Sequence, residues 1–337
     1  MKVYQADTDK RSLSDYAKVA KGIWITWEIQ RRNKGITKDL KWPLYEITHP
    51  GSKSRRYLHC MKKTIQVILK ERPNIVVAQN PSVVLATLVV MMKKVFGYRA
   101  VIDAHNSGIY PREGKSNFMM QISRRLQRLS DLTIVTNDHL RQVVESNGGR
   151  AVVLPDSLPD VPEIRPYPVT GRVNIAYICT FSADEPFREV FQAVRSLPAD
   201  VVIYVTGRYN GKIDKRTIPK NVRLLGFIPD NEYWSLLSSV DFIIDLTFRE
   251  NCLVCGAYEA VSLEKPVVLS NTNALITYFY KGCVYVSSSS NSIQDGIREA
   301  IEKREILYHD MLKLKEELKS SWKDRFEDFK QIVENLV

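Results

Sequence analysis

The segment from Thr247 to Ser270 carries the clearest chemical pattern in the chain. It consists of TFRENCLVCGAYEAVSLEKPVVLS, with Glu250 before an expected helix and Glu259 inside it. Asn251 is a residue type that caps helices, and free backbone N–H groups after such a cap favour a phosphate. A carboxylate at Glu259 could accept hydrogen bonds from a ribose diol. An acidic, capped surface helix without a ligand would show the same pattern. The N–H groups in question belong to Cys252, Leu253 and Val254.

Polar residues also follow other expected strands, where ligands of open α/β sheets bind. His105 stands just past a strand that ends at Asp103, either as a structural hydrogen-bonder or as a group that acts on a ligand. Arg208 and Lys212 lie in TGRYNGK, which also fits an ordinary solvated turn. The loop WEIQRRN follows the first strand and either meets a ligand or forms a solvated helix start. Its charged residues are Glu28, Arg31 and Arg32.

Cys252 and Cys255 form a Cys-x-x-Cys pair, a spacing found in zinc and redox sites. A structural zinc site takes a second pair of ligands at similar spacing, and the five cysteines of this chain provide none. We therefore expect small-residue packing beside a bound phosphate. The odd, scattered set of cysteines also favours a reducing compartment over a disulfide framework.

The elements that must position these residues are short β-rich runs that alternate with amphipathic helical stretches. This alternation is typical of α/β proteins, in which helices cover both faces of a parallel sheet. Each half of the chain offers six candidate strands. They are 23–28, 44–47, 75–79, 100–103, 132–136 and 151–154, then 174–178, 201–205, 222–225, 242–245, 266–269 and 283–286.

A proline-rich segment divides the 337 residues into two parts, each long enough for a domain. It runs from 155 to 171, and its five prolines remove backbone donors and stiffen an extended path. We predict an N-terminal domain over 1–160, a second domain over 171–318 and a C-terminal helix over 319–337. That helix is expected to pack back on the N-terminal domain through an apolar stripe. The stripe consists of Trp322, Phe326, Phe329 and Val333.

The net charge of +11 is unevenly distributed, because residues 1–165 sum to +13 and residues 166–337 to −2. On a helix over 53–72 the basic residues fall on one side and the apolar residues on the other. The stretch 115–129 combines basic residues with an apolar cluster, 118–120, that either dips into an interface or belongs to the core. We predict reversible binding of these stretches to an anionic membrane surface. Nucleic acid is the competing polyanion, but no recognised nucleic-acid-binding motif is present. The longest apolar stretch, 83–92, is too short to cross a bilayer, and the N-terminus has no apolar signal core. We expect a protein that is neither secreted nor membrane-spanning.

Segment 247–270 resembles the signature of family 4 retaining glycosyltransferases, in which two glutamates bracket a helix start before a Pro-Val strand. VRLLGFIPDNEYWSLLSSVDFIID (222–245) is similar to that family's strand, Gly-Phe-x-Pro turn, helix and strand, and AVIDAHN (100–106) and VVLPDSLPD (152–160) match its first domain. The resemblance covers most of the chain from about residue 23. It implies a GT-B fold, with two Rossmann-like domains whose parallel sheets face an interdomain cleft. The domain over 1–160 would be the acceptor side, and the domain over 171–318 would bind the nucleotide sugar. Glu28, Arg31 and Arg32 would then lie where they could meet an acceptor phosphate or the donor.

The same resemblance implies a metal-independent hexosyltransferase that acts with retention of anomeric configuration and needs no cofactor besides its donor, a nucleoside-diphosphate sugar. Glu259 would hold the ribose hydroxyls, while Glu250 and His105 would be the catalytic residues near the sugar. Helix N-termini and cationic side chains would stabilise the leaving diphosphate. Backbone contacts to the base would come from Gly226, Phe227 and Ile228.

The spacing of the two glutamates departs from the family pattern. Glu250 and Glu259 are nine positions apart, one more than usual. Either the loop carries an extra residue, or Asn251 occupies the first acidic position. We assign the first acidic position to Glu250, because a residue in a loop does not have to keep the spacing of a helical repeat.

The diphosphate clamp departs as well. The family places an Arg and a Lys after the first strand of the second domain, whereas CTFSADEP (179–186) has Thr180 and Glu185 there. Arg208 and Lys212, after the next strand, are the nearest replacements by position in the fold.

These features together predict a cytoplasmic enzyme, peripheral at the inner face of the membrane, that serves polysaccharide or glycolipid synthesis. The acceptor would be a lipid-linked or glycan hydroxyl, and nucleic acid would not be a partner. One alternative is a non-catalytic nucleotide-sugar-binding partner of a glycosyltransferase complex, which the altered loop 179–186 favours. Another is a GT-B sugar-nucleotide epimerase, which would require several histidines and acids that the sequence does not show together.

Overall fold

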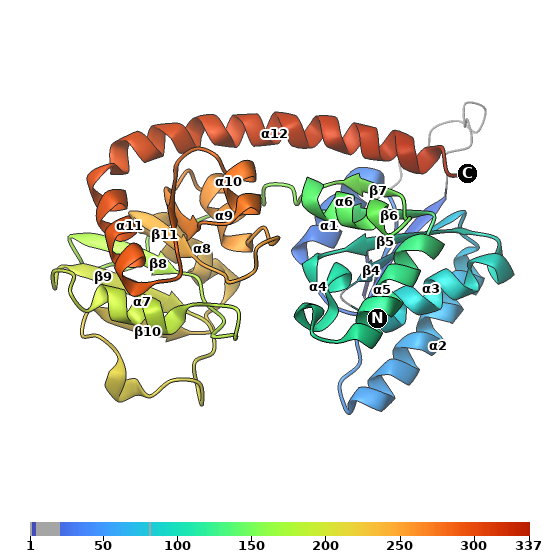
Figure 1. The fold of residues 1–337 in the computed structure, drawn as a ribbon, viewed down its shortest axis with the longest axis horizontal. Coiled ribbons are helices and arrows are strands. Elements are labelled where there is room, and N and C mark those ends of the chain that lie inside the picture. The colour runs from blue at the N-terminus through green and yellow to red at the C-terminus, as the bar shows by residue number, and fades with distance from the viewer. Residues whose placement is uncertain (1, 5–20, 81) are drawn as a thin grey trace. The chain divides into compact units, whose positions relative to one another are not determined.

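The computed structural model describes residues 2–4, 21–80 and 82–337, without the side chains of residues 2–4, 31 and 215. The chain forms two compact units. Unit 1 comprises Met1–Ser157 and Trp322–Val337, and unit 2 comprises Leu158–Ser321. In both units a sheet lies between helices, which is the layered α/β architecture expected from the alternating pattern (Figure 1).

The sheet of unit 1 has the strand order β1-β3-β2-β4-β5-β6-β7, and its strands are parallel except for β1. The six strands predicted in this half are confirmed, and β1 is an addition that pairs antiparallel with β3. The strands form because their apolar runs are buried on both faces. Their bounds are β1 (Lys2–Tyr4), β2 (Gly22–Thr26), β3 (Leu44–Glu46), β4 (Ile75–Asn80), β5 (Arg99–Ala104), β6 (Leu132–Val135) and β7 (Ala151–Val153).

Alternate side chains of this sheet serve two separate cores. Val76 and Ala78 of β4 pack against α2, α3, α5 and α6, whereas Ile75 and Val77 pack against α1 and the end of α12. The expected stripe of the last helix therefore covers the second face, where Phe329 is fully buried. The helices are α1 (Arg31–Leu40), α2 (Lys53–Glu71), α3 (Val83–Phe96), α4 (Asn106–Ile109), the 3₁₀ turn η1 (Pro111–Gly114), α5 (Asn117–Leu129) and α6 (Asp138–Ser146).

The sheet of unit 2 is entirely parallel, with the order β10-β9-β8-β11-β12-β13. The six strands predicted for this half are confirmed. The order reverses at β8, since β9 and β10 lie to one side of it and β11 to the other. The bounds are β8 (Val173–Tyr177), β9 (Val201–Thr206), β10 (Val222–Gly226), β11 (Phe242–Asp245), β12 (Val267–Ser270) and β13 (Cys283–Val286).

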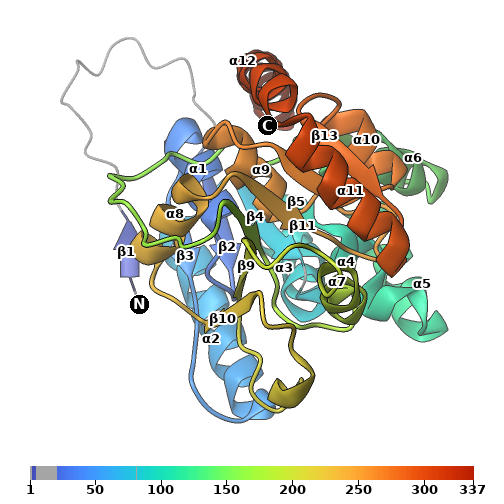
Figure 2. The same ribbon diagram turned by 90° about the vertical axis from the view of Figure 1, so that its left-hand side faces the viewer.

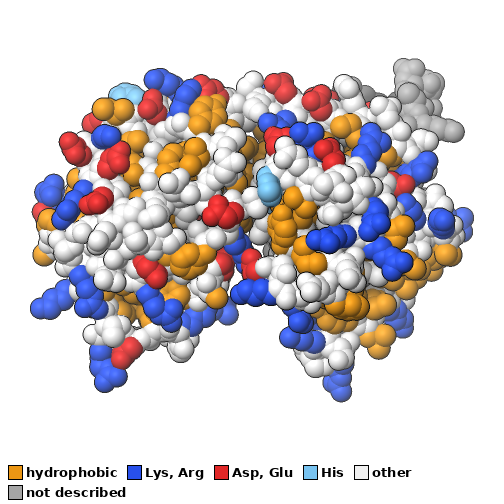
Figure 3. Space-filling view, in the orientation of Figure 1, with side chains coloured by type: hydrophobic (Ala, Val, Ile, Leu, Met, Phe, Trp, Pro, Cys, Tyr) orange, Lys and Arg blue, Asp and Glu red, His pale blue; other side chains and the backbone are white. Residues whose placement is uncertain are grey.

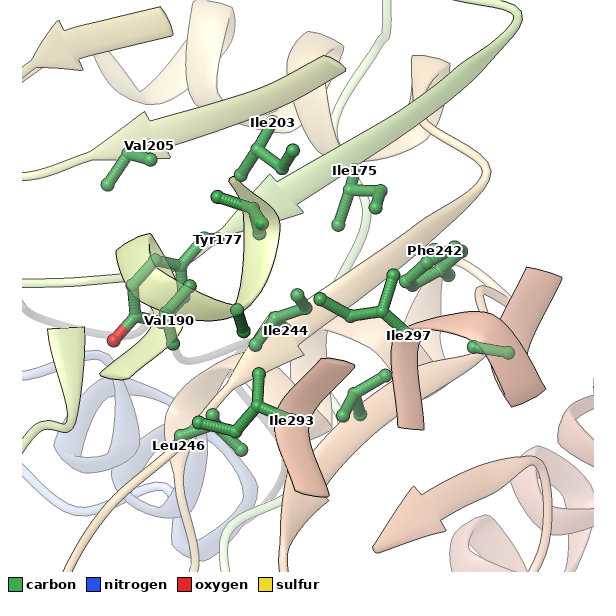
Figure 4. Close-up of a cluster of buried hydrophobic side chains, with 14 of the residues drawn as sticks. Ile175, Tyr177, Val190, Ile203, Val205, Phe242, Ile244, Leu246, Ile293 and Ile297 are labelled. Atoms are coloured by element: carbon green, nitrogen blue, oxygen red, sulfur yellow. The ribbon is translucent and has the colours of Figure 1, made fainter. Parts of the chain in front are cut away.

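Helices cover both faces of this second sheet. On one face α7 and α11 lie side by side and bury a cluster that includes Ile175, Tyr177 and Phe242 (Figures 2 and 4). On the other face α8, α9, α10 and the first part of α12 pack on the remaining strand side chains. The bounds are α7 (Phe187–Val194), the 3₁₀ turn η2 (Lys215–Thr217), α8 (Asp230–Ser239), α9 (Cys255–Ser262), α10 (Asn273–Tyr278), α11 (Ser290–Glu302) and α12 (Arg304–Glu334).

Helix α12 is one continuous element of 31 residues, so it begins well before the expected helix over 319–337. Its division between units falls at Trp322, whose indole N–H donates to the carbonyl of Pro155 at 3.1 Å. No helix among the described residues, α12 included, has the combination of length and apolar character needed to span a bilayer. All five cysteines are free thiols.

Candidate functional site

The loops that follow β8, β9 and β10 meet at the carboxyl edge of the unit 2 sheet. Lys212, after β9, donates through Nζ to the carbonyl of Thr180, after β8, at 2.7 Å. The N–H of Gly207 donates to the carbonyl of Gly226 at 2.8 Å. Gly207 has φ +95°, and a Cβ there would lie 1.8 Å from the carbonyl oxygen of Cys179, so only glycine permits this approach. Lys212, which was predicted to replace the missing diphosphate-binding cations, therefore lies against the loop 179–186 from which they are missing.

Arg208 and Phe227 form an exposed pair at the same edge. The guanidinium carbon of Arg208 lies 5.2 Å from the centre of the Phe227 ring, within range of a cation–π interaction. Gly226 ends β10 with φ +74°, and Phe227 follows it with 72% of its surface exposed. Ile228 packs against the apolar cluster beneath α8. The structure thus brings Arg208, Lys212 and residues 226–228 together, and an exposed aromatic ring offers a flat base a stacking surface.

The loop 179–186 encloses Glu185 as an internal anion. Its carboxylate accepts hydrogen bonds from the backbone N–H groups of Thr180 at 2.9 Å and Ser182 at 3.0 Å, and from the Thr180 hydroxyl at 2.9 Å. Converging N–H groups in a turn of this kind form an anion-binding concavity. Here a side chain of the same loop fills it. The loop 179–186 thus lacks the Arg and Lys of the family pattern, and its own Glu185 accepts the hydrogen bonds of its N–H groups.

Helix α9 begins at Cys255, so the prediction that Asn251 caps it is wrong. The N-cap is Val254, which makes no side-chain cap. The first turn is capped from the neighbouring strand instead, because Asp245 Oδ2 accepts a hydrogen bond from the N–H of Gly256 at 2.8 Å. A Cβ on Gly256 would lie 2.5 Å from that oxygen, so the contact depends on glycine. The carboxyl group of Asp245 thus caps the start of the helix whose N-terminus was expected to face a phosphate.

The loop between β11 and α9 is held at its start by Asp184. The N–H of Phe248 donates to the Asp184 carbonyl at 2.7 Å, and Arg249 forms an ion pair with the Asp184 carboxylate at 3.1 Å. The sequence did not single out Arg249, although a cation beside Glu250 is visible in it. Glu250 itself is exposed. Three other predicted donor-site residues are half-buried and precede the helix: Asn251, Cys252 and Leu253.

Glu259 lies inside α9 with only 6% of its surface exposed. The Tyr233 hydroxyl on α8 donates to Glu259 Oε2 at 2.5 Å. Burial raises the pKa of the nearby Asp245 carboxyl well above its ordinary value; the Gly256 N–H opposes this rise, and the Glu259 carboxylate adds to it. Asp245 therefore keeps its proton at a pH where an exposed aspartate has lost it. Glu259 was predicted from the sequence, whereas Asp245 and Tyr233, which come from other elements, were not.

In unit 1 the predicted ligand-facing residue Arg32 lies in the interior. Its guanidinium forms ion pairs with Asp103 at 3.0 Å and with Asp156 at 2.5 Å, and donates to the carbonyl of Leu154 at 2.8 Å. Burial by itself would raise the pKa of Asp103, but the neighbouring Arg32 and His105 together outweigh burial and hold that pKa below its usual range. Arg32 therefore joins the ends of three segments: β5, β7 and the start of α1.

Two other residues were predicted in the loop after β2. Glu28 is exposed, and its backbone N–H donates to the Thr26 hydroxyl at 3.0 Å. Arg31 is the first residue of α1, and its side chain lies outside the described residues. Arg32, the third member of the set, is thus the one for which the structure defines a full set of partners.

His105 lies at the carboxyl edge of the unit 1 sheet, next to the Arg32 network. Its Nε2 is 3.6 Å from Asp103 Oδ2. Asn80 at the end of β4 pairs in register with Ala104, which precedes His105. Within the described part of the chain, three buried polar atoms here have no hydrogen-bond partner: Asn80 Oδ1, His105 Nε2 and Asn106 Oδ1. Buried polar atoms are normally satisfied, so this group suits a polar ligand such as a sugar hydroxyl.

Across the ranges that the structure describes, no three His, Cys, Asp or Glu side chains are grouped so that they could hold a metal ion.

The lowered pKa of Asp103 gives a prediction about acid stability. Because this pKa is lower in the folded protein than its ordinary value of 3.8, the stabilisation is complete above that value and is lost as the pH falls toward the folded pKa. We expect the free energy of unfolding in urea to fall more steeply below about pH 4 in the wild type than in Asp103→Asn. Asp138→Asn, at an exposed pair with Arg141, is the control and should keep the wild-type slope. Equal slopes in wild type and Asp103→Asn would contradict the assignment.

No family model matches the chain, and no curated protein does. Solved structures match it over most of its length. Sucrose-phosphate synthase from Thermosynechococcus elongatus has a TM-score of 0.70 at 11% identity and covers 88% of this chain and 84% of its own. HepE of Anabaena in complex with UDP-glucose has a TM-score of 0.69 at 14% identity, with 94% and 99% covered. The chain has the GT-B fold.

MnaA of S. aureus, in a co-structure with UDP, also matches, with a TM-score of 0.57 at 14% identity over 86% of this chain and 90% of its own. At these identities the likeness shows the GT-B fold but not the activity of this chain. The prediction of two Rossmann-like α/β units is confirmed by these matches together with the two sheets.

Proposed function

We propose that the protein is a glycosyltransferase that binds a nucleoside-diphosphate sugar on unit 2. The observation that carries this proposal is Glu259, a buried carboxylate hydrogen-bonded by Tyr233 near the carboxyl edge of a GT-B sheet. A buried carboxylate is retained only where hydrogen bonds compensate it, and the two vicinal hydroxyls of a ribose supply such bonds. HepE, which shares the fold, binds UDP-glucose in its own structure.

The other parts of the donor have candidate partners at the same edge. Phe227 and the backbone of Gly226 and Ile228 would meet the base, and Arg208 and Lys212 would meet the diphosphate. Lys212 supports this assignment because its ammonium group already lies against the loop 179–186. Two cations near the leaving group would stabilise the charge that develops as the glycosidic bond breaks.

The transfer we propose occurs with retention and without a metal, as the resemblance to family 4 implies. His105 and Glu250 are the proposed catalytic residues. The unsatisfied polar atoms of Asn80, His105 and Asn106 support sugar binding at the unit 1 edge. We further propose a lipid-linked or glycan acceptor in polysaccharide or glycolipid synthesis, at the cytoplasmic side of an anionic membrane, which the positive charge of residues 1–165 favours.

A thermal-shift screen of nucleoside-diphosphate sugars tests donor binding. A donor at a concentration a hundred times its Kd stabilises the folded state by about 2.7 kcal/mol. The unfolding temperature of the protein should therefore rise by several degrees. UDP-glucose is the first ligand to test, and UDP and free glucose are the controls that separate nucleotide from sugar recognition. The absence of a shift with every nucleotide sugar would contradict the proposal.

One observation favours a second candidate, a non-catalytic nucleotide-sugar-binding protein. The Glu185 carboxylate accepts hydrogen bonds from N–H groups of the loop 179–186, so this loop has fewer free donors for a diphosphate. Proton NMR separates the candidates. The protein is incubated in water with a donor that raises its unfolding temperature, water serves as the acceptor, and the spectra follow the sugar that is released. Release of the α-anomer first from an α-linked donor supports a retaining transferase, and a changed sugar on an intact nucleotide indicates an epimerase. A donor that binds and stays intact indicates the non-catalytic role.

A further inference from the structure

The outer face of α3 in unit 1 is apolar. This helix contains the longest apolar stretch of the sequence, and its inner face is buried through Leu85, Ala86, Val89 and Val90. Its outer face is apolar as well, with Met91 exposed over 66% and Val95 over 76% of their surfaces. The spacing of this outer stripe places its members on one side of the helix. The stripe consists of Val84, Leu88, Met91 and Val95.

The two helices that flank α3 extend this apolar face. Helix α3 packs between α2 and α5 on one side of the unit 1 sheet (Figure 1). Leu58 on α2 and Phe118 on α5 are exposed over 72% and 70% of their surfaces. Leu69 on α2 and Leu129 on α5 are about half exposed. We call the outer faces of these three helices the α2–α3–α5 surface. Exposed large apolar side chains that cluster in this way mark an interaction site.

The same surface is strongly cationic. Helices α2, α3 and α5 together contain eleven Lys and Arg residues and one acidic residue, Glu71. Glu71 forms ion pairs with Lys21 and with Lys70 of the same helix. In the view of Figure 3, Lys and Arg side chains surround hydrophobic ones over these helices, and acidic side chains are rare there. The exposed cations include Arg55, Arg56, Lys62, Lys94, Arg124 and Arg125.

We propose that the α2–α3–α5 surface docks on an anionic lipid bilayer, with the α3 stripe inserted at the boundary between headgroups and acyl chains. An apolar stripe flanked by Lys and Arg is the pattern that binds such an interface. A second copy of this chain is a poor occupant, because a symmetric contact would bring the two sets of cations together. Nucleic acid would use the cations but would leave the exposed leucine, methionine and valine side chains in water.

The lipid occupant rests on the proposed function, since a lipid-linked acceptor would be met at a bilayer. The chain itself connects the two features. His105 directly precedes α4, which continues through η1 into α5. Docking of α5 on the bilayer would therefore fix the position of the segment that carries the proposed catalytic histidine.

Co-sedimentation with lipid vesicles tests the proposal, with no nucleotide present. Wild-type protein should bind vesicles that contain phosphatidylglycerol and bind pure phosphatidylcholine weakly. Met91→Glu/Val95→Glu places two charges in the stripe and should reduce partitioning by more than about tenfold. Ile306→Glu, at an apolar residue of α12 that is 64% exposed, is the matched control and should bind as the wild type does. Thermal unfolding should show that both variants fold.

The contribution of the cations is measured in the same assay. Arg124→Ala/Arg125→Ala should lose about fivefold in partitioning for each residue, and the loss should shrink as salt is added. Three results would overturn the proposal: no binding to anionic vesicles, full binding of Met91→Glu/Val95→Glu, or a concentration-dependent dimer that this double substitution abolishes. The donor thermal shift is a separate measurement, so failure of the docking surface and failure of the proposed transferase are distinguishable.

Discussion

Arg32→Ala is expected to lower the free energy of unfolding of unit 1 by about 3–5 kcal/mol, the usual cost of removing one partner from a buried ion pair. Arg32 neutralises Asp103 and Asp156, and it also donates to the carbonyl of Leu154. Without it, the buried Asp103 carboxylate and the carbonyl of Leu154 lose the donors that Arg32 supplies. Urea unfolding followed by tryptophan fluorescence measures the loss, since Trp24, Trp27, Trp42 and Trp322 are in unit 1 and Trp234 is in unit 2.

Two further variants make this result specific. Arg32→Lys keeps the charge but loses the planar, forked set of donors, so its stability should lie between those of the wild type and Arg32→Ala. Arg141→Ala removes an exposed arginine from its pairs with Asp138 and Glu145, and should cost less than about 1 kcal/mol. If Arg32→Ala were no more costly than Arg141→Ala, the network would not hold the three segments together.

Glu259→Ala should reduce the affinity for a nucleoside-diphosphate sugar by roughly a hundredfold. The two hydroxyls of a ribose would each lose a hydrogen bond to a charged acceptor, at about 1.5 kcal/mol or more each. Isothermal titration calorimetry with the donor found by thermal shift gives the affinity of each variant. Glu259 lies beneath the surface rather than on it, so the fold of the variant must be checked by circular dichroism.

Conservative substitutions separate ribose binding from packing. Glu259→Gln keeps the volume and one acceptor oxygen and should lose less affinity than Glu259→Ala. Tyr233→Phe removes the hydroxyl that donates to Glu259 and should weaken binding only modestly, because the carboxylate remains. Glu299→Ala, at a surface ion pair of α11 with Lys303, is the control. Unchanged affinity in a folded Glu259→Ala would place the donor elsewhere.

The strands could be predicted because their signal is local. Strand β4 is buried at every residue, and its first four residues, 75–78, form an apolar run because side chains on both faces of the strand are buried. The alternation of these runs with amphipathic helices predicts parallel sheets with helices on both faces. The short strand Lys2–Tyr4 was missed because its pairing with β3 depends on a partner distant in sequence.

The start of α9 could not be predicted, because the residue that caps it comes from another element. Asn251 has the side chain that usually caps a helix, yet Asp245 at the end of β11 makes the hydrogen bond to Gly256. Only the folded sheet brings the strand end beneath the helix. The same reason applies to Tyr233, which reaches Glu259 from the preceding helix α8.

The sequence by itself determined the fold class, the division near the proline-rich segment and the two acidic positions around which a donor site was predicted. The tertiary structure decided how those charges are used. Arg32, expected to face a ligand, is enclosed by Asp103 and Asp156, and the apolar run that forms α3 is buried on one side and exposed on the other. Residue type and spacing report local preference, whereas burial and electrostatic partnership depend on contacts between distant segments that only folding creates.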